Sequence, residues 1–200
     1  MVVVNQKEKR KTETYILEPS GGLVKTGKLY TDFYSDLKTM IEEYEPLYPG
    51  IDLWFRKKVA PELAKGKRRH GIIIYHDDKP VGSAIIRKGE HVKICSMRVT
   101  PDYQHKHLGR ALMAAITFGV YPQAKTFHFT IPEELWESHK GFFEQYGFRV
   151  QEPSKKQYRA FSQELACSAS YNQVQVEVIR TQIQTILKEG EKKWKMKNQF

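Results

Sequence analysis

Cysteine is scarce in this chain of 200 residues, which contains Cys95 and Cys167 and no other. Two cysteines far apart in sequence do not make a disulfide framework, so we expect a cytoplasmic protein with free thiols. The seven histidines are scattered without the spacing of metal ligands. The sequence therefore predicts no metal site.

Long hydrophobic runs are also missing. No apolar stretch approaches the roughly 20 residues that a bilayer-spanning helix needs. The amino-terminal segment MVVVNQKEKRKTET turns polar after three valines, whereas a signal peptide needs an apolar region of about 7–15 residues. We therefore expect neither membrane insertion nor secretion. Apolar residues still make up 40% of the chain, enough to build the core of one domain.

Acidic residues are fewer than basic residues. Thirty-three Lys and Arg face 23 Asp and Glu, which gives a formal net charge of +10. Such a surface attracts nucleic acid, acidic lipid or a phosphate-rich cofactor. A basic face that is simply solvated is the alternative.

The periodicity of apolar residues predicts a mixed α/β layered domain. A turn-rich segment at residues 76–80 separates two apolar runs and predicts a hairpin. Pro61 is expected to interrupt the second helix, and Gly147 to end the last one. The expected strands are 13–19, 71–75, 81–87, 92–99, 126–131, 148–151 and 158–165, and the expected helices are 29–45, 53–63, 108–120 and 137–146.

The composition changes near the carboxyl terminus. Val176, Ile179, Ile183 and Ile186 recur at helical spacing, and a basic segment around Trp194 follows. We expect a domain at 1–166 and a helix with a basic tail at 167–200. The helix is expected to dock on its own domain; a homodimer contact, a nucleic-acid tail and a linker to a further domain are the alternatives.

The segment from Met97 to Leu112 is the most informative for function. A strand ends at Val99, Pro101 starts a turn, and a tight loop opens directly into a helix. The first turn of a helix has unpaired N–H groups and the positive end of the helix dipole, so it attracts anions. Gly109 lets the backbone come close to a ligand, and Lys106 and Arg110 add positive charge. A pyrophosphate would fit this loop.

This segment resembles the cofactor loop of GNAT acetyltransferases, in which a strand is followed by Gln/Arg-x-x-Gly-x-Gly/Ala and a helix. Gln104 and Gly109 match that pattern, and His107 stands where the family has its first loop glycine. The segment 142–148 resembles the closing helix and turn of the same family. The resemblance covers roughly residues 13–165.

The resemblance implies a mostly antiparallel central sheet flanked by helices and N-acetyl transfer from acetyl-CoA to a primary amine. It implies that the strand end binds the pantetheine arm and that loop amides bind the pyrophosphate. The implied coenzyme A residues are Met97, Arg98, Val99, Gln104, His105, Lys106, His107, Leu108, Gly109 and Arg110, together with Phe143 of the closing helix.

The family often uses a tyrosine of the closing helix to protonate the leaving thiolate, and this chain has Phe143 at that position. Tyr146, nearly one helical turn further on, is our substitute candidate, and His139 is a second candidate acid or base. Glu90 and Glu134 are candidates for guiding a water that deprotonates the amine. Cys95 shares strand parity with Met97, which would place it toward the thioester or in the core.

The acceptor amine stays open. A small molecule or a protein is the first expectation. An aminoacyl-tRNA or another RNA-borne amine is the second, because basic clusters lie at 56–58 and 65–69. A non-catalytic acetyl-CoA sensor is the third, because of Phe143 and His107.

Overall fold

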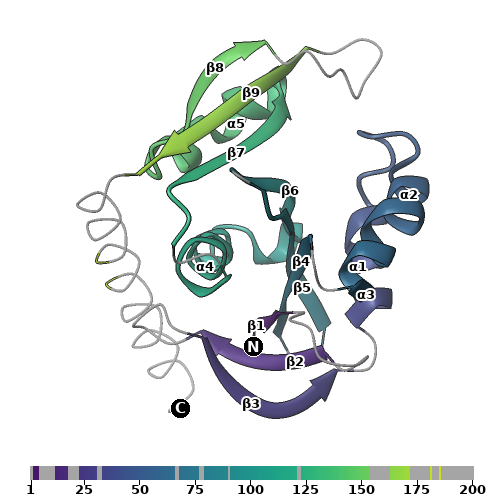
Figure 1. Cartoon of the computed structure of the whole chain (residues 1–200). Helices are drawn as coiled ribbons and strands as arrows, with labels where there is room; N and C mark the ends of the chain where they lie inside the picture. The colour runs from purple at the N-terminus through teal and green to yellow at the C-terminus, as the bar shows by residue number, and fades with distance from the viewer. Residues whose placement is uncertain are drawn as a thin grey trace.

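A nine-stranded sheet in the order β3-β2-β1-β4-β5-β6-β7-β9-β8 organises the chain (Figure 1). The computed structural model describes residues 2–4, 12–17, 23–30, 33–65, 68–76, 79–89, 91–120, 123–153, 163–171, 181 and 185. Among these, β6 and β7 are the one parallel pair of neighbouring strands. The strands are β1 (Val2–Val4), β2 (Thr12–Leu17), β3 (Leu23–Tyr30), β4 (Arg69–His76), β5 (Lys79–Arg87), β6 (Val92–Val99), β7 (Thr126–Pro132), β8 (Arg149–Pro153) and β9 (Glu164–Ser170).

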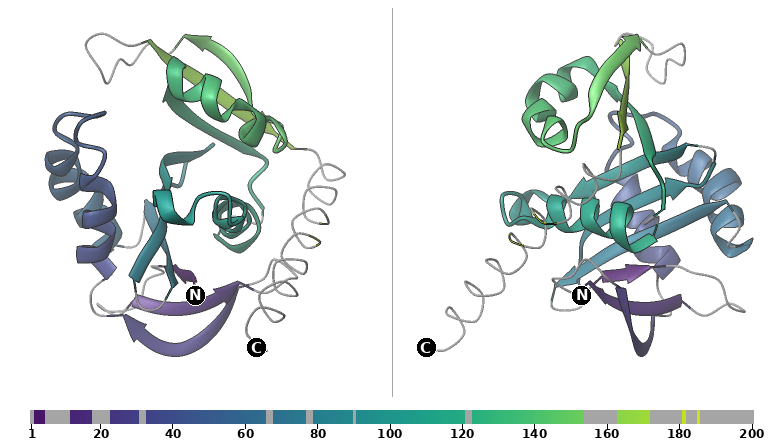
Figure 2. Two further views of the ribbon diagram at one scale, coloured as in Figure 1. Left: turned by 180° about the vertical axis from the view of Figure 1, so that it is seen from behind. Right: turned by 60° about the vertical axis from the view of Figure 1, so that its left-hand side comes forward.

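Helices cover both faces of this sheet, as the two further views in Figure 2 show. On one face lie α1 (Phe33–Glu42), α2 (Ile51–Trp54), the π-helical η1 (Phe55–Val59) and α3 (Ala60–Lys65). On the other lie α4 (Leu108–Ala114), which continues as the π-helical η3 (Ala115–Val120), and α5 (Glu133–Glu144). The short 3₁₀ helix η2 (Pro101–Tyr103) leads into α4. The expected mixed, mostly antiparallel α/β layering is confirmed.

Two hydrophobic cores result from the alternation of side chains along β4 and β5. The α1-side core contains Ile73, Tyr75 and Ile85 with apolar residues of α1, η1 and α3. The α4-side core contains Ile72 and Ala84 with residues of α4, α5, β7 and β9. Each face of the central strands is therefore assigned to one helical layer.

The amino-terminal part differs from the expectation. Leu29 and Tyr30 belong to β3, where they pair with Glu13 and Thr12, so the helix begins at Phe33 and not at Leu29. The helical spacing still identified the buried face of α1, namely Phe33, Leu37, Met40 and Ile41. The sequence pattern could not predict the strand pairing of Leu29, because its partner Glu13 lies 16 residues away in the chain.

The second helical segment is continuous from α2 through η1 to α3, so the expected interruption at Pro61 is wrong. The Ala60 N–H donates to the carbonyl of Phe55, five residues earlier. Proline has no N–H, so a regular α-helix would lose one i to i−4 hydrogen bond at Pro61. The π-helical turn just before Pro61 already departs from that hydrogen-bond pattern.

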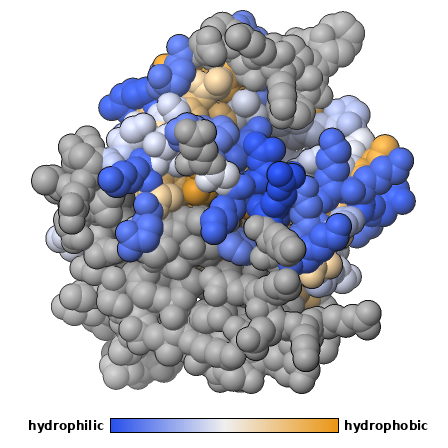
Figure 3. All heavy atoms as spheres, in the orientation of Figure 1, coloured by the Kyte–Doolittle hydropathy of each residue, from blue (hydrophilic) through white to orange (hydrophobic). Residues whose placement is uncertain are grey.

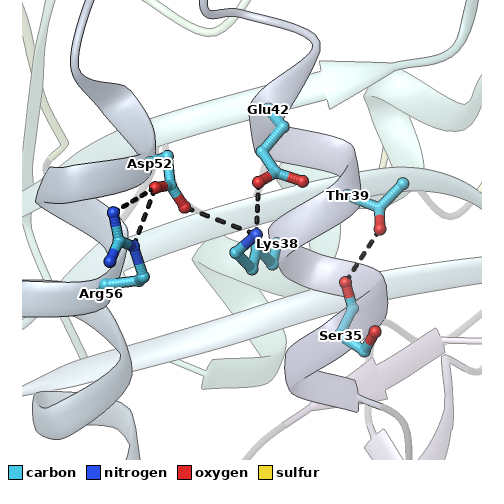
Figure 4. A network of polar contacts seen from close by, with 6 residues as sticks. All are labelled: Ser35, Lys38, Thr39, Glu42, Asp52 and Arg56. Atoms are coloured by element: carbon cyan, nitrogen blue, oxygen red, sulfur yellow. Dashed lines mark hydrogen bonds and ion pairs between the residues drawn. The ribbon is translucent and has the colours of Figure 1, made fainter.

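A polar network ties α1 to this segment (Figure 4). Lys38 pairs with Glu42 of its own helix and, at 3.4 Å, with Asp52 of α2. Asp52 also accepts from Arg56 of η1 at 2.7 Å. The network holds the start of α2 against the middle of α1.

The carboxyl-terminal strand also differs from the expectation. β9 runs from Glu164 to Ser170, later than the expected strand at 158–165, and so passes through the domain boundary expected at residue 166. The expected C-terminal helix falls almost entirely outside the described residues. Thr181 and Thr185 are helical, and the Thr185 hydroxyl donates to the Thr181 carbonyl at 3.0 Å.

Two features are absent from the described residues. No helix there combines the length and the apolar character that a bilayer crossing requires. No group of three or more His, Cys, Asp or Glu side chains in that part of the chain could hold a metal ion.

Candidate functional site

The parallel strands β6 and β7 pair at Val92 with Phe127 and at Lys93 with His128, and their pairing stops there. The rest of β6 keeps β5 as its neighbour, while β7 continues along β9. The two strands therefore diverge toward their carboxyl ends. Among the described strands, none pairs with the edge of β6 that turns away from β5 between Ile94 and Val99.

A β-bulge in β6 decides which side chains face each helical layer. Ile85 pairs with Ser96 and Ile86 with Ile94, so Cys95 is an extra residue. Cys95 packs against the α1-side core, whereas Met97 packs against the α4-side core. Our expectation that Cys95 shares the face of Met97 is wrong, because the bulge shifts the alternation by one residue. The Cys95 sulfur accepts from Arg69 Nη1 at 3.1 Å.

The open edge of β6 is contacted by Tyr44, just after the end of α1. The Tyr44 hydroxyl donates to the Met97 carbonyl at 3.0 Å. Arg98 lies over the Tyr44 ring at 5.0 Å and pairs with Glu43. Burial raises the pKa of Tyr44 and lowers the pKa of Arg98. Sequence analysis missed Tyr44, because helical periodicity placed it on the buried face of a longer helix.

The loop after β6 is a built turn with an exposed backbone. The Thr100 N–H donates to the Val81 carbonyl at 3.0 Å, and Gln104 Nε2 donates to the Val99 carbonyl at 3.4 Å. His105 and His107 have φ angles of 60° and 63°, in the left-handed region. Residues 104–107 are all exposed. This backbone can turn its N–H groups toward an anion at the start of α4.

Lys106 is held above this loop by an aromatic contact. Its Nζ lies 4.6 Å from the centre of the Tyr103 ring, a cation–π distance. The Tyr103 hydroxyl is in turn 3.1 Å from His76 Nδ1 at the end of β4. The β4–β5 hairpin therefore helps to hold in place Lys106, one of the two cations that the sequence analysis assigned to the loop.

At Gly109 the structure shows a close helix contact that the sequence analysis did not predict. The φ angle of Gly109 is not among the positive ones, and a Cβ built on it would lie 3.2 Å and 3.3 Å from two ring carbons of Phe142. The close approach in the structure is thus between α4 and α5. Phe142 packs this helix start against the closing turn.

Tyr146 lies in that closing turn and is 3% exposed. Its ring contacts Phe142 at 5.3 Å between centroids, and its carbonyl accepts from the Tyr171 hydroxyl at 2.5 Å. Burial raises the pKa of Tyr146 to about 12, and the charge of Arg110 opposes this rise. The structure therefore brings two residues named from sequence, Arg110 and Tyr146, into electrostatic contact.

Of the other named residues, Phe143 adjoins this group, since its carbonyl accepts from the Tyr146 N–H at 3.0 Å, whereas His139 and Glu134 lie on the exposed side of α5. Phe143 stacks in an aromatic cluster with Phe129 at 4.6 Å and Trp136 at 6.3 Å. His139 is exposed on α5, and its ring contacts Ser138 and Leu135 of the same helix. Glu134 is exposed on the first turn of α5. Glu90 lies outside the described residues.

Replacing His107 with glycine is expected to raise the free energy of unfolding by about 0.5–1 kcal/mol, because glycine adopts the left-handed conformation without the steric cost. Urea denaturation measures this change. His139→Gly is the matched control: His139 is helical, so the same substitution there should destabilise by about 0.5–1 kcal/mol. A His107→Gly protein that is less stable would show that the imidazole makes a compensating contact.

Comparisons with known proteins agree on the fold. The family model of the acetyltransferase (GNAT) domain matches residues 67–150. A search of the curated proteins finds none that matches the sequence. Among solved structures, the fold is similar to that of a protein from Desulfovibrio desulfuricans described as a GNAT-family acetyltransferase, with a TM-score of 0.60, 19% identity, and 72% of this chain and 95% of the other covered.

Two further structures extend this similarity. PaiA N-acetyltransferase from Thermoplasma acidophilum, solved with coenzyme A, has a TM-score of 0.51 at 14% identity, with 70% of this chain and 91% of that chain covered. An acetyltransferase from Thermus thermophilus has a TM-score of 0.52 at 15% identity, with 69% of this chain and 90% of that chain covered. At such identities these likenesses show a common fold.

Proposed function

We propose that this chain is a GNAT acetyltransferase, whose domain model matches residues 67–150, and that it transfers an acetyl group from acetyl-CoA to a primary amine. The observation that carries the proposal is the divergence of β6 and β7 beside an exposed, left-handed loop at the start of α4. The divergence leaves a strand edge that can hydrogen-bond an extended pantetheine arm. The loop supplies amides and cations for a pyrophosphate.

The residues present fit coenzyme A in charge and in hydrogen-bonding capacity. Lys106 and Arg110 flank the loop, and residues 104–107 are exposed to a ligand. Met97, Arg98 and Val99 lie on the part of β6 that has no pairing with β7. PaiA N-acetyltransferase was crystallised with coenzyme A, which supports the same ligand here.

Tyr146 is our proposed proton donor to the departing thiolate. Its phenol is protonated at neutral pH, and the charge of Arg110 at the start of α4 lowers the pKa of Tyr146 against the effect of burial, which favours proton donation. The Phe143 ring packs in the aromatic cluster and has no ionisable proton to donate. His139 is the weaker candidate, because its contacts hold it on the exposed side of α5.

We place the acceptor amine on the α1 side of β6. There Tyr44 and Arg98 line the strand edge, and Glu43 adds a carboxylate. A neutral amine must reach the thioester carbonyl, so a carboxylate nearby would attract the ammonium form before it loses its proton. A small-molecule or protein amine fits this wall, and the choice between them remains a prediction.

Mass spectrometry of the purified protein with labelled acetyl-CoA and a cell extract tests the proposed activity. Transfer of label to an amine in the extract is the expected result, and its mass identifies the acceptor class. Coenzyme A binding without any labelled product would favour the acetyl-CoA sensor over the enzyme.

Coenzyme A affinity is expected to fall as salt rises, because Lys106 and Arg110 meet phosphate charges in an exposed loop. Lys106→Gln should weaken binding several-fold at low salt and flatten the salt dependence. Isothermal titration calorimetry at several salt concentrations measures both. Lys140→Gln is the control, since Lys140 is exposed on α5 and pairs with Glu137 at 2.7 Å. Equal effects of the two substitutions would contradict a specific role of Lys106.

A further inference from the structure

Cationic side chains stand directly opposite one another across neighbouring strands of the sheet. Arg69 of β4 pairs in register with Arg87 of β5, and Arg87 pairs with Lys93 of β6. Lys93 pairs with His128 of β7. His128 pairs with Ser168 of β9, which pairs with Arg149 of β8. One register position therefore runs through six strands and holds Arg, Arg, Lys, His, Ser and Arg, a set we name the basic row.

The Cβ atoms of the basic row lie on the same face of the sheet, because residues in direct register share a face. Cys95, two residues after Lys93, packs in the α1-side core, and Arg69 donates to Glu62 of α3 at 2.7 Å. The row therefore lies on the face that carries α1 to α3. It begins under α3 and runs away from it toward β8.

Beyond α3 this face is polar and accessible. Arg87 and Arg149 are exposed, and Lys93, His128 and Ser168 are half-buried. α5 covers the opposite face of β7, β9 and β8: it lies behind these strands in Figure 1 and in front of them in the rear view of Figure 2. Figure 3, in the orientation of Figure 1, shows hydrophilic residues spread across the middle of the molecule.

Like charges placed directly opposite in a sheet destabilise it by up to about 1 kcal/mol per pair. Glu62 compensates the charge of Arg69, whose side chain is 7% exposed. Arg149 Nη1 donates to the carbonyls of Phe148 at 2.8 Å and of Glu144, the last residue of α5, at 3.3 Å, so the guanidinium lies toward the end of α5 and keeps its charge. Burial lowers the pKa of His128 to about 4, and the charges of Lys93, Arg87 and His91 add to this effect. An anionic ligand bound along the row would reduce the repulsion between these like charges.

We infer that the basic row binds the phosphate backbone of single-stranded RNA. Neighbouring strands lie about 4.8 Å apart, so Arg87 and Arg149 are separated by about 19 Å across four strand steps. At about 3.4 Å per nucleotide of a stacked strand, this length holds five or six nucleotides. An open sheet face suits a single strand, whose bases can lie against side chains, better than it suits a duplex.

The side chains between the cations fit the rest of a nucleotide. His128 is neutral at physiological pH because its pKa is low, and its ring is 6.5 Å from the ring of His91, so the row carries flat rings for base stacking. Ser168 and, two residues along β7 from His128, Thr130 carry hydroxyl groups that can meet a ribose 2′-hydroxyl. The described side chains along the row are polar, which disfavours a lipid surface.

Fluorescence anisotropy with a labelled twelve-nucleotide oligouridylate tests the row. The wild-type protein should bind with an affinity that falls steeply with salt. The triple variant Arg87→Gln, Lys93→Gln, Arg149→Gln should weaken binding at low salt by at least tenfold. Its slope of log affinity against log salt should be smaller by about two, since each phosphate contact in a single strand contributes about 0.7.

The control variant removes the same charge elsewhere: Arg56→Gln, Lys57→Gln, Lys58→Gln, three exposed positions of η1. It should leave the slope within about 0.5 of the wild type, less than one phosphate contact contributes. His128→Ala should weaken binding about tenfold with an unchanged slope, because it removes stacking and no charge. Circular dichroism and coenzyme A calorimetry show that each variant is folded.

Four results would overturn the inference: no binding of the oligouridylate at low salt, an equal or larger loss in the η1 variant, tighter binding of a DNA oligonucleotide of the same length, or tighter binding to acidic phospholipid vesicles. The measurement uses RNA without acetyl-CoA. Its failure would therefore leave acetyl transfer untouched, and failure of acetyl transfer would leave the RNA result standing.

Discussion

Replacing Tyr146 with phenylalanine is expected to lower the turnover number by about 10²–10⁴-fold, the usual contribution of a general acid. The substitution removes one hydroxyl and keeps the ring that packs on Phe142. The backbone carbonyl that accepts from Tyr171 is unchanged. Coenzyme A affinity should therefore stay close to that of the wild type, while steady-state kinetics show the loss in turnover.

Tyr75→Phe provides the matched control. Tyr75 lies in the α1-side core and its hydroxyl donates to Asp36 at 2.6 Å, so its loss should cost about 1 kcal/mol of stability without changing turnover. A loss below about threefold for Tyr146→Phe, far short of a general acid's contribution, would mean that Tyr146 is structural. Phe143→Tyr, which restores the usual acid of the family, should then raise the rate.

Gly109→Val is expected to abolish detectable coenzyme A binding. A Cβ at this position meets the Phe142 ring at 3.2 Å and 3.3 Å, and the two further carbons of valine need space that the ring fills. Either the start of α4 or Phe142 must shift, and both border the loop that we assign to the pyrophosphate. Calorimetry with coenzyme A measures the loss, and circular dichroism shows whether the fold survives.

The chain offers a close control for this substitution. Gly141 lies on α5, and a Cβ there meets nothing within 4 Å, so Gly141→Val should bind coenzyme A normally. Adding Phe142→Ala to Gly109→Val should restore part of the affinity by opening the space. Unchanged affinity in a folded Gly109→Val protein would remove the start of α4 from the coenzyme A site.

Several features around the candidate site could be predicted from the sequence, because they depend on residues that are close together in the chain. The hairpin of β4 and β5 followed from the turn-rich segment between two apolar runs, and β6 was predicted with its observed bounds, Val92–Val99. The strand, loop and helix around Gln104 and Gly109 followed from turn chemistry and helical periodicity. Local patterns of this kind carry their own signal.

Other features needed partners that sequence order does not reveal. The β2–β3 pairing took Leu29 and Tyr30 out of the expected helix. The bulge at Cys95 reversed the facing of the strand before Met97, although periodicity alone gave no sign of an extra residue. Tyr44 reached Met97 across 53 positions of sequence.

By itself the sequence determined that this protein is a mixed α/β domain with a strand, loop and helix at β6 to α4, where we predict anion binding, because periodicity and turn chemistry are local properties. The tertiary structure alone decided that Gly109 is small to admit Phe142, that Arg110 acts on Tyr146, and that cations from Arg69 to Arg149 share one register. Strand register and helix packing join residues far apart in the chain, and hydrogen bonds and shape that form only on folding select these partners.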